Sequence, residues 1–376
     1  MKPAEKLVKE NIRNLKPCVH GGEVLDAADK SGFKREEILD FSSSVNPLGP
    51  SMKALEAARK AFSQIAAYPD SNSSELRQAI ASHFNGLIKE NVIVGNGSTE
   101  LMYLFAETFL NEGDKVIIPA PTFGEYEGAV RKAGETPTFV KLNRGFNIEA
   151  STFANEMADA KLVFLCNPNN PTSMLIQPDT ITEIIESAMK QNTLVFLDED
   201  FLEFVENEKA LSMINKITKY PNLFILRSFT KIFGLTGLRV GYGVATPEII
   251  NLLSCAKIPW NVNCLAQTAA VAALKDEEHL KITRDLIKKE KAKLLLELSK
   301  ISSFKIFPAD ANFFFINIKK SGLTAAELTS KLLSQGILIR DCTSFRGVDQ
   351  YFVRVAVKTR VENERLIEVL KRIVKN

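Results

Sequence analysis

The sequence predicts a mixed α/β protein in which a large domain with a mainly parallel sheet is joined to a smaller α+β domain. Three observations predict this fold class. Between about residues 91 and 229, short strands that are apolar on both faces alternate with helical stretches, a pattern typical of a parallel sheet covered by helices. After about residue 246 the pattern changes to long charged helices followed by further strands. The length of 376 residues suits two or three domains.

The elements of the first part follow in order along the chain. Apolar residues at helical spacing predict helices over 51–66 and 73–86, and Ser73 and Ser74 are candidate N-caps of the second. From Asn91 the run NVIV leads into GNGSTE and then LMYLFAETFL, which indicates a strand, a glycine turn and a helix. Further strands are predicted at 115–119, 136–140, 162–166, 193–197 and 222–229.

The C-terminal third has its own pattern. Charged helices are predicted through 262–300, with one solvated face. Strand-like segments follow at FKIFP, NFFFINI, GILIR and YFVRVAV, with amphipathic helices over 323–334 and 361–374. Because the sequence contains no Pro/Gly/Ser-rich linker and no internal repeat of fixed period, we expect the two parts to pack together.

Composition and charge exclude several classes of protein. The chain is 45% hydrophobic and 25% charged, which excludes disorder, collagen and coiled coil. Its net charge of +3 gives no electrostatic footprint for a nucleic-acid partner. The apolar runs are far shorter than the roughly 20 residues that cross a bilayer, and the N-terminus lacks the apolar stretch of a signal peptide, so no membrane partner and a cytoplasmic location are expected.

Cysteines and histidines indicate neither disulfides nor a metal site. The five cysteines are odd in number, scattered and without a CxxC pair, as expected for a cytoplasmic protein. The three histidines do not form a metal-ligating pattern. These residues are Cys18, Cys166, Cys255, Cys264 and Cys342, and His20, His83 and His279.

The segment RSFTKIFGLTGLRVGY (227–242) carries the most chemistry. An isolated lysine usually belongs to a surface loop, but Lys231 follows a strand, with Ser228 and Thr230 before it and Arg239 eight positions on (239 − 231 = 8). An amine that forms a Schiff base needs a partly desolvated, cation-lined pocket that lowers its pKa. Hydroxyls beside a guanidinium are suited to a phosphate monoester.

This segment resembles the lysine motif of fold-type I pyridoxal 5′-phosphate (PLP) enzymes, in which SxxK is followed eight residues later by arginine. Four further segments resemble the family's cofactor contacts and occur in the family's order, each at the end of a predicted strand. They are GNGSTE (95–100) with Ser98 and Thr99, PTFGEY (121–126) with Phe123, NPNNPT (167–172) with Asn170, and VFLDEDF (195–201) with Asp198.

The resemblance implies a role for each of these residues. It implies that Lys231 holds PLP as a Schiff base and that Phe123 stacks on the pyridine ring. Asp198 is implied to keep the pyridinium nitrogen protonated, so that the ring acts as an electron sink. Asn170 is implied to hydrogen-bond the phenolic oxygen. The cofactor phosphate is assigned to Ser98, Thr99, Ser228, Thr230 and Arg239.

The family also implies how the chain is divided and how it associates. Residues 48–258 correspond to the PLP-binding large domain, whereas residues 1–47 and 259–376 together form the small domain. Tyr68 in AYPD resembles a tyrosine that, in one branch of the family, reaches the cofactor phosphate of the neighbouring subunit. The resemblance therefore implies a homodimer with shared active sites.

Within fold type I the chain is most similar to the branch that contains histidinol-phosphate aminotransferase and the threonine-phosphate decarboxylase of cobalamin biosynthesis. Arg340 and Arg354 match contacts to substrate anions, and two guanidiniums suit a substrate with a carboxylate and a phosphate. Three segments favour the decarboxylase: VHGG (19–22) with His20 and Gly21, DFSSSVNPLGP (40–50) with Asn46, and the stretch from residue 340 to 366. Phe201 replaces a tyrosine found in many aminotransferases.

Two positions depart from the pattern. Ser173 stands where the family has the glycine of NPTG, which tolerates backbone angles that serine avoids. Glu23 follows HGG where the decarboxylase has asparagine. We therefore expect Ser173 to alter its turn and Glu23 to alter the contacts of the N-terminal flap.

The sequence-based hypothesis is PLP-dependent decarboxylation of an O-phospho amino acid. The first substrate is L-threonine O-phosphate, which gives (R)-1-amino-2-propanol phosphate, and the second is L-serine O-phosphate, which gives ethanolamine phosphate. Histidinol-phosphate aminotransferase is the alternative within the same chemistry. A non-catalytic PLP-fold binding protein is the alternative outside it, and the presence of Lys231 argues against that reading.

Overall fold

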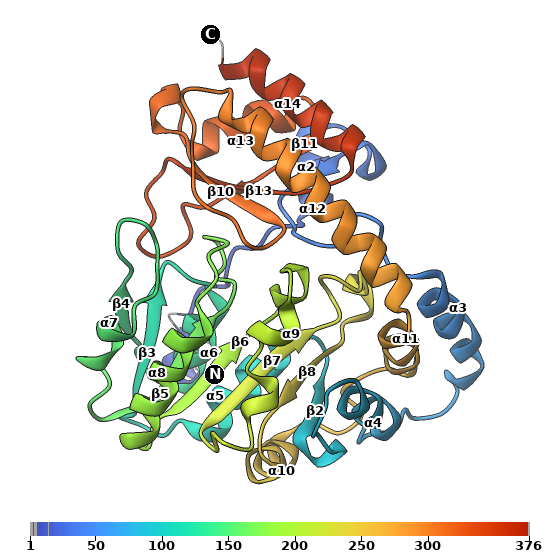
Figure 1. Ribbon diagram of the computed structural model, residues 1–376, viewed down its shortest axis with the longest axis vertical. Coiled ribbons are helices and arrows are strands. Elements are labelled where there is room, and N and C mark those ends of the chain that lie inside the picture. Colours follow the sequence, from blue (N-terminus) through green and yellow to red (C-terminus); the bar gives the residue numbers. More distant parts are fainter. Residues whose placement is uncertain (1–2, 4–5, 14, 375–376) are drawn as a thin grey trace.

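Within residues 3, 6–13 and 15–374, which the computed structural model describes, the strands form three sheets. The large sheet lies in the lower part of Figure 1, and the other two lie above it. The strand order of the large sheet is β2-β8-β7-β6-β5-β3-β4. Its strands are β2 (Val92–Gly95), β3 (Lys115–Ala120), β4 (Thr138–Lys141), β5 (Ala160–Cys166), β6 (Leu194–Asp198), β7 (Leu223–Ser228) and β8 (Gly241–Val244).

The predicted mainly parallel sheet is confirmed. Strands β3 to β7 pair in parallel, so their C-terminal ends lie along one edge of the sheet. The sequence pattern missed β8, which runs antiparallel between β2 and β7. Its sequence GYGV is rich in glycine, a residue that weakens strands. The close packing explains Gly243, because a Cβ there would lie 2.1 Å from the Phe224 ring.

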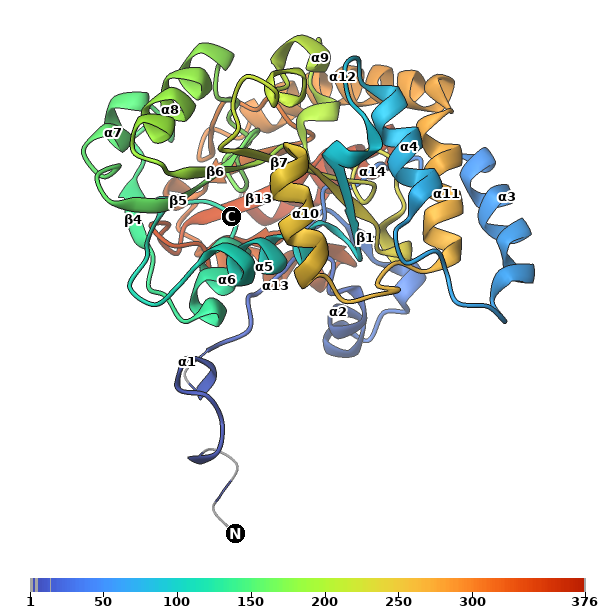
Figure 2. The same cartoon turned by 90° about the horizontal axis from the view of Figure 1, so that it is seen from below.

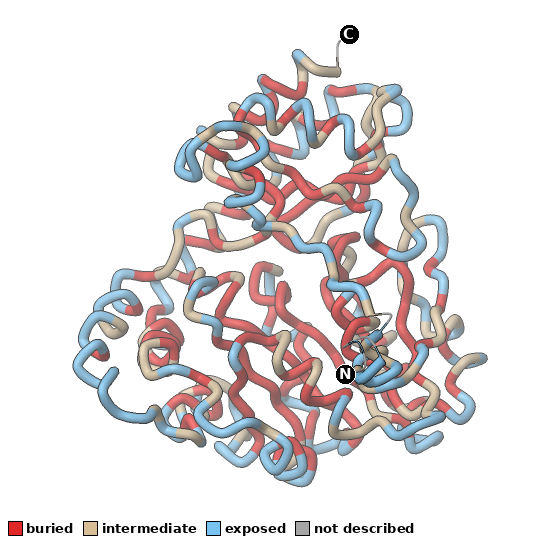
Figure 3. Tube along the Cα trace, turned by 180° about the vertical axis from the view of Figure 1, so that it is seen from behind, coloured by how far each residue is buried: buried red, intermediate tan, exposed pale blue. Residues whose placement is uncertain are grey.

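Helices cover both faces of the large sheet (Figure 2). Helices α5, α6 and α10 pack on one face, and α8 packs on the other. Consequently the central strands are buried along their length, as the red trace in Figure 3 shows. The helices of this part are α3 (Met52–Ala61), α4 (Ser74–His83), α5 (Ser98–Phe109), α6 (Glu125–Ala133), α7 (Ala150–Ala154), α8 (Pro178–Lys190), α9 (Glu208–Leu211) and α10 (Pro247–Ala256).

The N-terminus of α4 differs from the expected capping. Ser73 precedes the helix with φ 47°, and its side chain makes no capping hydrogen bond. Instead, Asp70 Oδ2 accepts a hydrogen bond from the Ser74 N–H at 2.6 Å. The left-handed backbone at Ser73 turns its hydroxyl away from the helix end, so a carboxylate from the preceding turn satisfies the first free N–H.

The smaller part contains an antiparallel sheet with the order β12-β13-β10-β9. The long helix α12 runs beside it and reaches toward the large sheet, as Figure 1 shows. The strands are β9 (Lys305–Ile306), β10 (Phe313–Asn317), β11 (Ile337–Leu338), β12 (Arg340–Asp341) and β13 (Phe352–Ala356). Its helices are α12 (Glu277–Ser299), α13 (Ala325–Leu333) and α14 (Arg360–Val374). Helix α11 (Cys264–Leu274) precedes them in the chain and packs against α3 and α4 (Figure 1).

The N-terminal segment joins the C-terminal part through a short parallel pair. Strand β1 (Leu39–Asp40) pairs with β11, and helices α1 (Glu10–Arg13) and α2 (Val24–Ser31) precede it. In Figure 2, α1 lies outside the main body of the molecule. The division at residues 48 and 258 stays a prediction.

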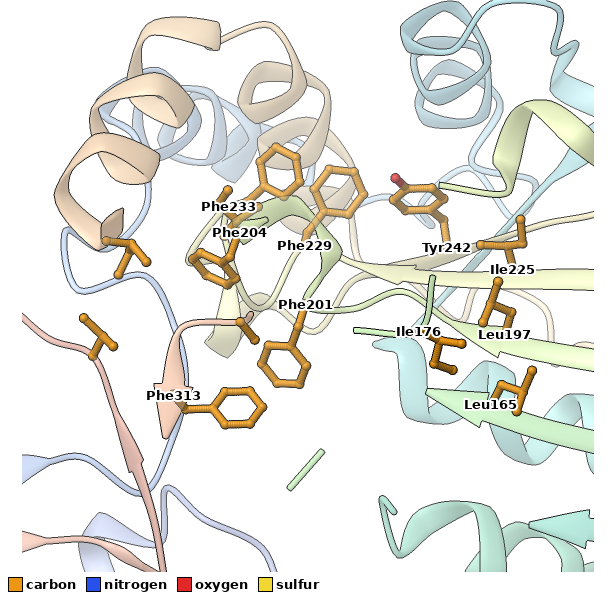
Figure 4. Packing of buried hydrophobic residues seen from close by; sticks show 14 of the residues in the cluster. Leu165, Ile176, Leu197, Phe201, Phe204, Ile225, Phe229, Phe233, Tyr242 and Phe313 are labelled. Carbon is orange, nitrogen blue, oxygen red and sulfur yellow. The ribbon is translucent and has the colours of Figure 1, made fainter. Parts of the chain in front are cut away.

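The apolar core is continuous between the two parts. In Figure 4, Phe201 from the end of β6 faces Phe313 of β10, and the ring centroids are 5.0 Å apart in an edge-on arrangement. Phe229 and Phe233 belong to the same cluster. Edge-on aromatic contacts add to the hydrophobic term, so this cluster fixes the small sheet against the strand ends of the large sheet. None of the helices in the described part of the chain combines the length and apolar character needed to cross a membrane.

Candidate active site

A cavity of about 930 Å³ lies where β5, β6 and β7 end. Asn170 follows β5, Asp200 follows β6 and Lys231 follows β7, so the large sheet brings residues distant in sequence to one wall. The C-terminal edge of a parallel sheet is the usual ligand site of such folds. The remaining wall comes from α5, α6, the small sheet and the N-terminal segment 15–22.

Lys231 is partly buried in this wall. Its Nζ lies 5.2 Å from the centroid of the Phe201 ring. Burial lowers the pKa of the Lys231 amine, and the charge of Asp200 opposes that shift. The backbone carbonyl of Lys231 accepts a hydrogen bond from the Asn46 N–H at 2.9 Å, which fixes the loop after β7 to residue 46. An amine with a lowered pKa is the nucleophile that Schiff-base formation requires.

Asp198 is buried at the end of β6 and is not itself part of the cavity wall. Its Oδ2 accepts a hydrogen bond from the Tyr126 hydroxyl at 2.6 Å, and its Oδ1 accepts one from the Asp200 N–H at 2.9 Å. Burial and the neighbouring Asp200 charge raise the pKa of Asp198. A buried acid of this kind is suited to a cationic N–H partner, as a pyridinium ring provides.

Ser98, Thr99, Thr230 and Arg239 line one end of the cavity, and we call this group the phosphate cup. Ser98 and Thr99 begin α5, where free backbone N–H groups favour an anion. Gly97 at this helix start has φ +83°, and a Cβ there would lie 2.4 Å from Arg239 Nη2. The absence of a side chain at residue 97 therefore lets the guanidinium approach the helix N-terminus.

Ser228 lies behind the phosphate cup rather than in the cavity wall. It is buried at the end of β7, its hydroxyl donates to Thr230 Oγ1 at 2.7 Å, and it accepts from the Thr230 N–H at 2.9 Å. In this structure Ser228 thus orients Thr230, which does line the cavity.

Phe123 and Asn170 lie in the cavity wall, as the resemblance implies. The Phe123 ring lies between two other rings, with its centroid 6.0 Å from that of His20 and 5.7 Å from that of Tyr126. Asn170 is buried, and its Oδ1 accepts a hydrogen bond from Arg354 Nη1. The amide is therefore oriented by an arginine of the small sheet.

Arg354, from β13 of the small sheet, is a buried guanidinium in the cavity wall. Its Nη2 donates to the Ser42 carbonyl at 2.7 Å, and its Nε is buried without a hydrogen-bond partner among the described residues. Burial lowers the pKa of Arg354 to about 10, which still leaves it a cation at neutral pH. A buried cation with an unused donor is suited to a carboxylate.

Arg340 anchors the N-terminal segment across the cavity. Its Nη1 donates to the His20 carbonyl at 3.0 Å, and its Nη2 donates to the Val19 carbonyl at 2.7 Å. The His20 ring forms an ion-pair contact of 2.7 Å with Glu125 Oε1. Gly21 packs so closely on the chain that a Cβ would lie 2.3 Å from the Ser42 carbonyl oxygen. The HGG segment therefore forms part of the cavity wall.

Besides Asp198 and Ser228, two further predicted site residues do not line the cavity. Asn46 points away from it, because its Nδ2 donates to the Ile232 carbonyl at 2.8 Å and to Thr283 Oγ1 at 2.9 Å. The expectation that Asn46 binds substrate is therefore corrected: it supports the backbone of the lysine loop. Tyr68 is 81% exposed and stacks on Trp260 with ring centroids 4.7 Å apart. Its implied contact with a neighbouring subunit remains a prediction.

The two departures from the family pattern have structural outcomes. Ser173 adopts the left-handed backbone itself, with φ 64°, and its hydroxyl accepts a hydrogen bond from the Ala311 N–H at 3.0 Å. The turn is thus kept, and the serine ties it to the small sheet. Glu23 precedes α2 without capping it and does not line the cavity.

The sequence analysis missed four residues of the site. Asp200 and Glu125 are buried acids beside the predicted cofactor and substrate contacts, and Arg131 and Arg346 line the outer cavity around Glu127. Asp200 lies two residues after Asp198 in VFLDEDF, and Glu125 lies two residues after Phe123 in PTFGEY. Their position next to predicted site residues was the only sequence signal for these two acids. In the described residues, no cluster of three or more His, Cys, Asp or Glu side chains is arranged to hold a metal ion.

Comparisons with known proteins extend over the whole fold. A family model described as "Aminotransferase class I and II" matches residues 36–372. A histidinol-phosphate aminotransferase from Methanosphaera stadtmanae is 36% identical over 367 residues, which are 97% of this chain and 98% of the relative. The crystal structure of the histidinol-phosphate aminotransferase from Clostridium acetobutylicum has a TM-score of 0.84 and 31% identity, covering 90% of this chain and 100% of that chain. The crystal structure of L-threonine-O-3-phosphate decarboxylase from Porphyromonas gingivalis has a TM-score of 0.79 and 28% identity, covering 89% and 99%.

Proposed function

Because the chain belongs to the aminotransferase class I and II family, whose enzymes depend on PLP, we propose that it transaminates a phosphorylated amine, with histidinol phosphate as the first candidate. The observation that supports this proposal most is the identity to histidinol-phosphate aminotransferases along nearly the full length of both chains. The sequence analysis placed the decarboxylase first. The names of the relatives favour the alternative, and the proposal follows them.

The residues present fit PLP. Asp198 is a buried acid suited to the ring nitrogen, the phosphate cup offers hydroxyls and a guanidinium at a helix start, and Lys231 has a lowered pKa. Phe123 is available for the ring face, and Asn170 for the phenolic oxygen. Bound PLP supplies an electron-withdrawing ring that weakens the bonds at Cα of an attached substrate.

The opposite side of the cavity fits the substrate anions. We assign the substrate phosphate to the part of the cavity lined by His20 and Arg340, where the N-terminal segment contributes to the wall. The acceptor of a transamination is an oxo acid, and Arg354 is the buried cation suited to its carboxylate. We assign the proton transfer at Cα to Lys231 Nζ, because Lys231 lines the cavity at the proposed cofactor site.

Threonine-phosphate decarboxylation is the second candidate, and one observation favours it. The HGG segment packs on Ser42 and forms part of the cavity wall, as the decarboxylase resemblance implies. Phe201 beneath Lys231 carries no hydroxyl, which also matches that branch. In the decarboxylation one substrate carries both a phosphate and a carboxylate, whereas in the transamination histidinol phosphate brings the phosphate and the oxo acid brings the carboxylate. The cavity therefore suits either reaction by charge.

One assay distinguishes the two reactions. The PLP-loaded protein is incubated with histidinol phosphate plus 2-oxoglutarate and, separately, with L-threonine O-phosphate and L-serine O-phosphate. Glutamate formation in the first mixture is the expected result. Release of CO₂ from a phospho amino acid without glutamate formation would overturn the proposal in favour of the decarboxylase. A colourless wild-type protein after PLP addition would contradict both and support a non-catalytic binding protein.

We also propose that the enzyme is a homodimer with shared active sites. The Tyr68–Trp260 stack brings together two segments that carry exposed apolar side chains, with Phe62, Ile65 and Tyr68 on one and Ile258 and Trp260 on the other. A second copy covering these segments would bury them. Mixing equal amounts of inactive Lys231→Ala and Tyr68→Ala proteins tests the idea. A mixed dimer regains one of its two sites, and about half of the dimers are mixed after exchange, so the mixture should recover about a quarter of the wild-type activity. No recovery after subunit exchange would contradict it.

A further inference from the structure

Asp200 is an acidic side chain of the cavity to which the contacts described so far assign no role. It follows β6, is buried, and lines the wall with Ser98, Lys231 and Arg239. Its Oδ2 accepts a hydrogen bond from Ser98 Oγ at 3.0 Å. Its Oδ1 is buried without a hydrogen-bond partner among the described residues. A buried carboxylate oxygen without a donor is costly, so the unpartnered Oδ1 disfavours the ionised form of Asp200.

The charged and polar groups around Asp200 come from two strands with the segments that follow them and from one helix end. From β7 and the loop after it, Arg227, Lys231 and Arg239 attract the Asp200 charge. From β6 and the turn after it, Asp198 and Glu203 repel it. Ser98 at the start of α5 provides the direct hydrogen bond. Burial outweighs the attraction and raises the pKa of Asp200.

When Asp200 is ionised, the Ser98 hydroxyl is not available to donate a hydrogen bond to a phosphate in the cup. A serine hydroxyl has a single proton, and here Ser98 donates it to Asp200. Ser98 then presents only lone pairs to the cup. When Asp200 carries a proton, its O–H donates to Ser98 Oγ across the same contact, and the serine proton is free for a phosphate oxygen. A phosphate dianion beside an ionised carboxylate is also disfavoured, because like charges raise the pKa of the acid.

We propose that Asp200 takes up one proton from solvent when the cofactor phosphate binds, so that Asp200 and Ser98 form a proton relay that donates to the phosphate. The O–H bond on Asp200 is the only bond that forms. The relay makes Asp200 a cofactor-positioning residue. The inference concerns the cofactor alone, and it holds whichever phosphorylated substrate the enzyme uses.

The experiment uses pyridoxine 5′-phosphate, whose alcohol cannot condense with Lys231. The cofactor-free protein is titrated calorimetrically in two buffers of different ionisation enthalpy, which gives the protons taken up per site. We expect wild-type protein to take up as much as one proton more than Asp200→Asn, because the amide is a permanent donor. Across rising pH, the ratio of the wild-type Kd to the Asp200→Asn Kd should increase by as much as about tenfold per unit, and the probe's own ionisation cancels in that ratio.

Three controls accompany the titration. Pyridoxine without phosphate should show no difference between wild type and Asp200→Asn. Asp179→Asn removes an exposed acid from α8 and should behave as wild type. Ser98→Ala breaks the relay and should weaken binding of the phosphorylated probe without affecting pyridoxine. If Asp200→Asn does not fold, the wild-type proton uptake with the two probes decides the question alone.

Equal proton uptake by wild type and Asp200→Asn, with a constant Kd ratio across pH, would overturn the proposal. Failure of folded wild-type protein to bind the phosphorylated probe would refute the phosphate cup and the relay together. Both results are distinct from a failure of the proposed reaction, which is measured with substrates and PLP.

Discussion

Replacing Glu203 with glutamine tests whether the folded protein keeps this buried carboxyl group protonated at pH values where the unfolded chain has lost the proton. Glu203 lies in the turn after β6, 5% exposed, with Oε1 3.4 Å from Arg227 Nη1 and Oε2 without a partner among the described residues. Arg227 also contacts Glu199 at 2.8 Å and Glu208 at 3.6 Å. One guanidinium thus faces three carboxylates. Burial, aided by Glu208 and opposed by Arg227, raises the pKa of Glu203 to about 8.

The magnitude follows from the difference in pKa between the folded and unfolded chain. The pKa rises from 4.5 to about 8, a difference of about 3.5 units. Between these values the folded protein holds a proton that the unfolded chain has lost, so the free energy of unfolding falls as pH rises. As pH rises, Glu203 therefore lowers the free energy of unfolding by about 1.4 kcal/mol per pH unit, and by about 5 kcal/mol between the two pKa values.

Urea unfolding, followed by circular dichroism, measures how the free energy of unfolding depends on pH. Every sample should be cofactor-free, so that cofactor binding does not contribute to the difference. Between about pH 5.5 and about pH 7.5, wild-type protein should lose about 3 kcal/mol more than Glu203→Gln, which cannot titrate but keeps a donor at the same position. Glu112→Gln removes an exposed carboxylate and serves as the matched control. Parallel pH profiles for wild type and Glu203→Gln would refute the assignment of the buried proton to Glu203.

Three further substitutions test the cofactor site. Lys231→Ala removes the amine needed for a Schiff base, so the visible absorbance that PLP gives with wild type should be absent while the fold, checked by circular dichroism, is kept. Tyr126→Phe removes the 2.6 Å hydrogen bond to Asp198, and a bond to a charged group is worth about 1.5 to 3 kcal/mol, so PLP affinity measured by equilibrium dialysis should fall about 10- to 100-fold. Gly97→Ala places a Cβ 2.4 Å from Arg239 and should weaken PLP binding, whereas Gly113→Ala has a similar positive φ and open space and affects only stability. Unchanged affinity in either Tyr126→Phe or Gly97→Ala would contradict the corresponding contact.

The cofactor side of the site was predictable because strand ends and motifs coincide. Once parallel strands are expected, residues just after them must meet at one edge, and this places Asn170, Asp200 and Lys231 in one wall. The resemblance of the motifs to a known family then suggests a chemical role for residues that the sheet already brings together. Strand β8 escaped prediction because its glycines are selected by contacts with Phe224 and Ser98, which come from distant parts of the chain.

The substrate side was less predictable because it depends on how loops are turned. Ser43, Ser44 and Val45 line the cavity, whereas the next residue, Asn46, directs its amide to the backbone of Ile232. Successive side chains of an extended segment point in different directions, so a motif match within one residue does not settle which side chain reaches the ligand. The contact between Asn46 and Ile232 spans 186 positions and leaves no local sequence signal.

The charges of the site explain why its buried acids are tolerated. Asp198 and Asp200 lie close together in the chain at the end of β6. Burial raises the pKa of both side chains, and the charge of Asp200 raises the pKa of Asp198 further. Neither acid has a guanidinium in direct contact, whereas Glu199, in the same turn, is paired with Arg227 at 2.8 Å. The acid without a function at the cofactor is therefore neutralised within the chain. We expect a bound cofactor to offer a cationic ring nitrogen to Asp198, and Asp200 to take up a proton, so that binding relieves the cost of these two buried acids in the free protein.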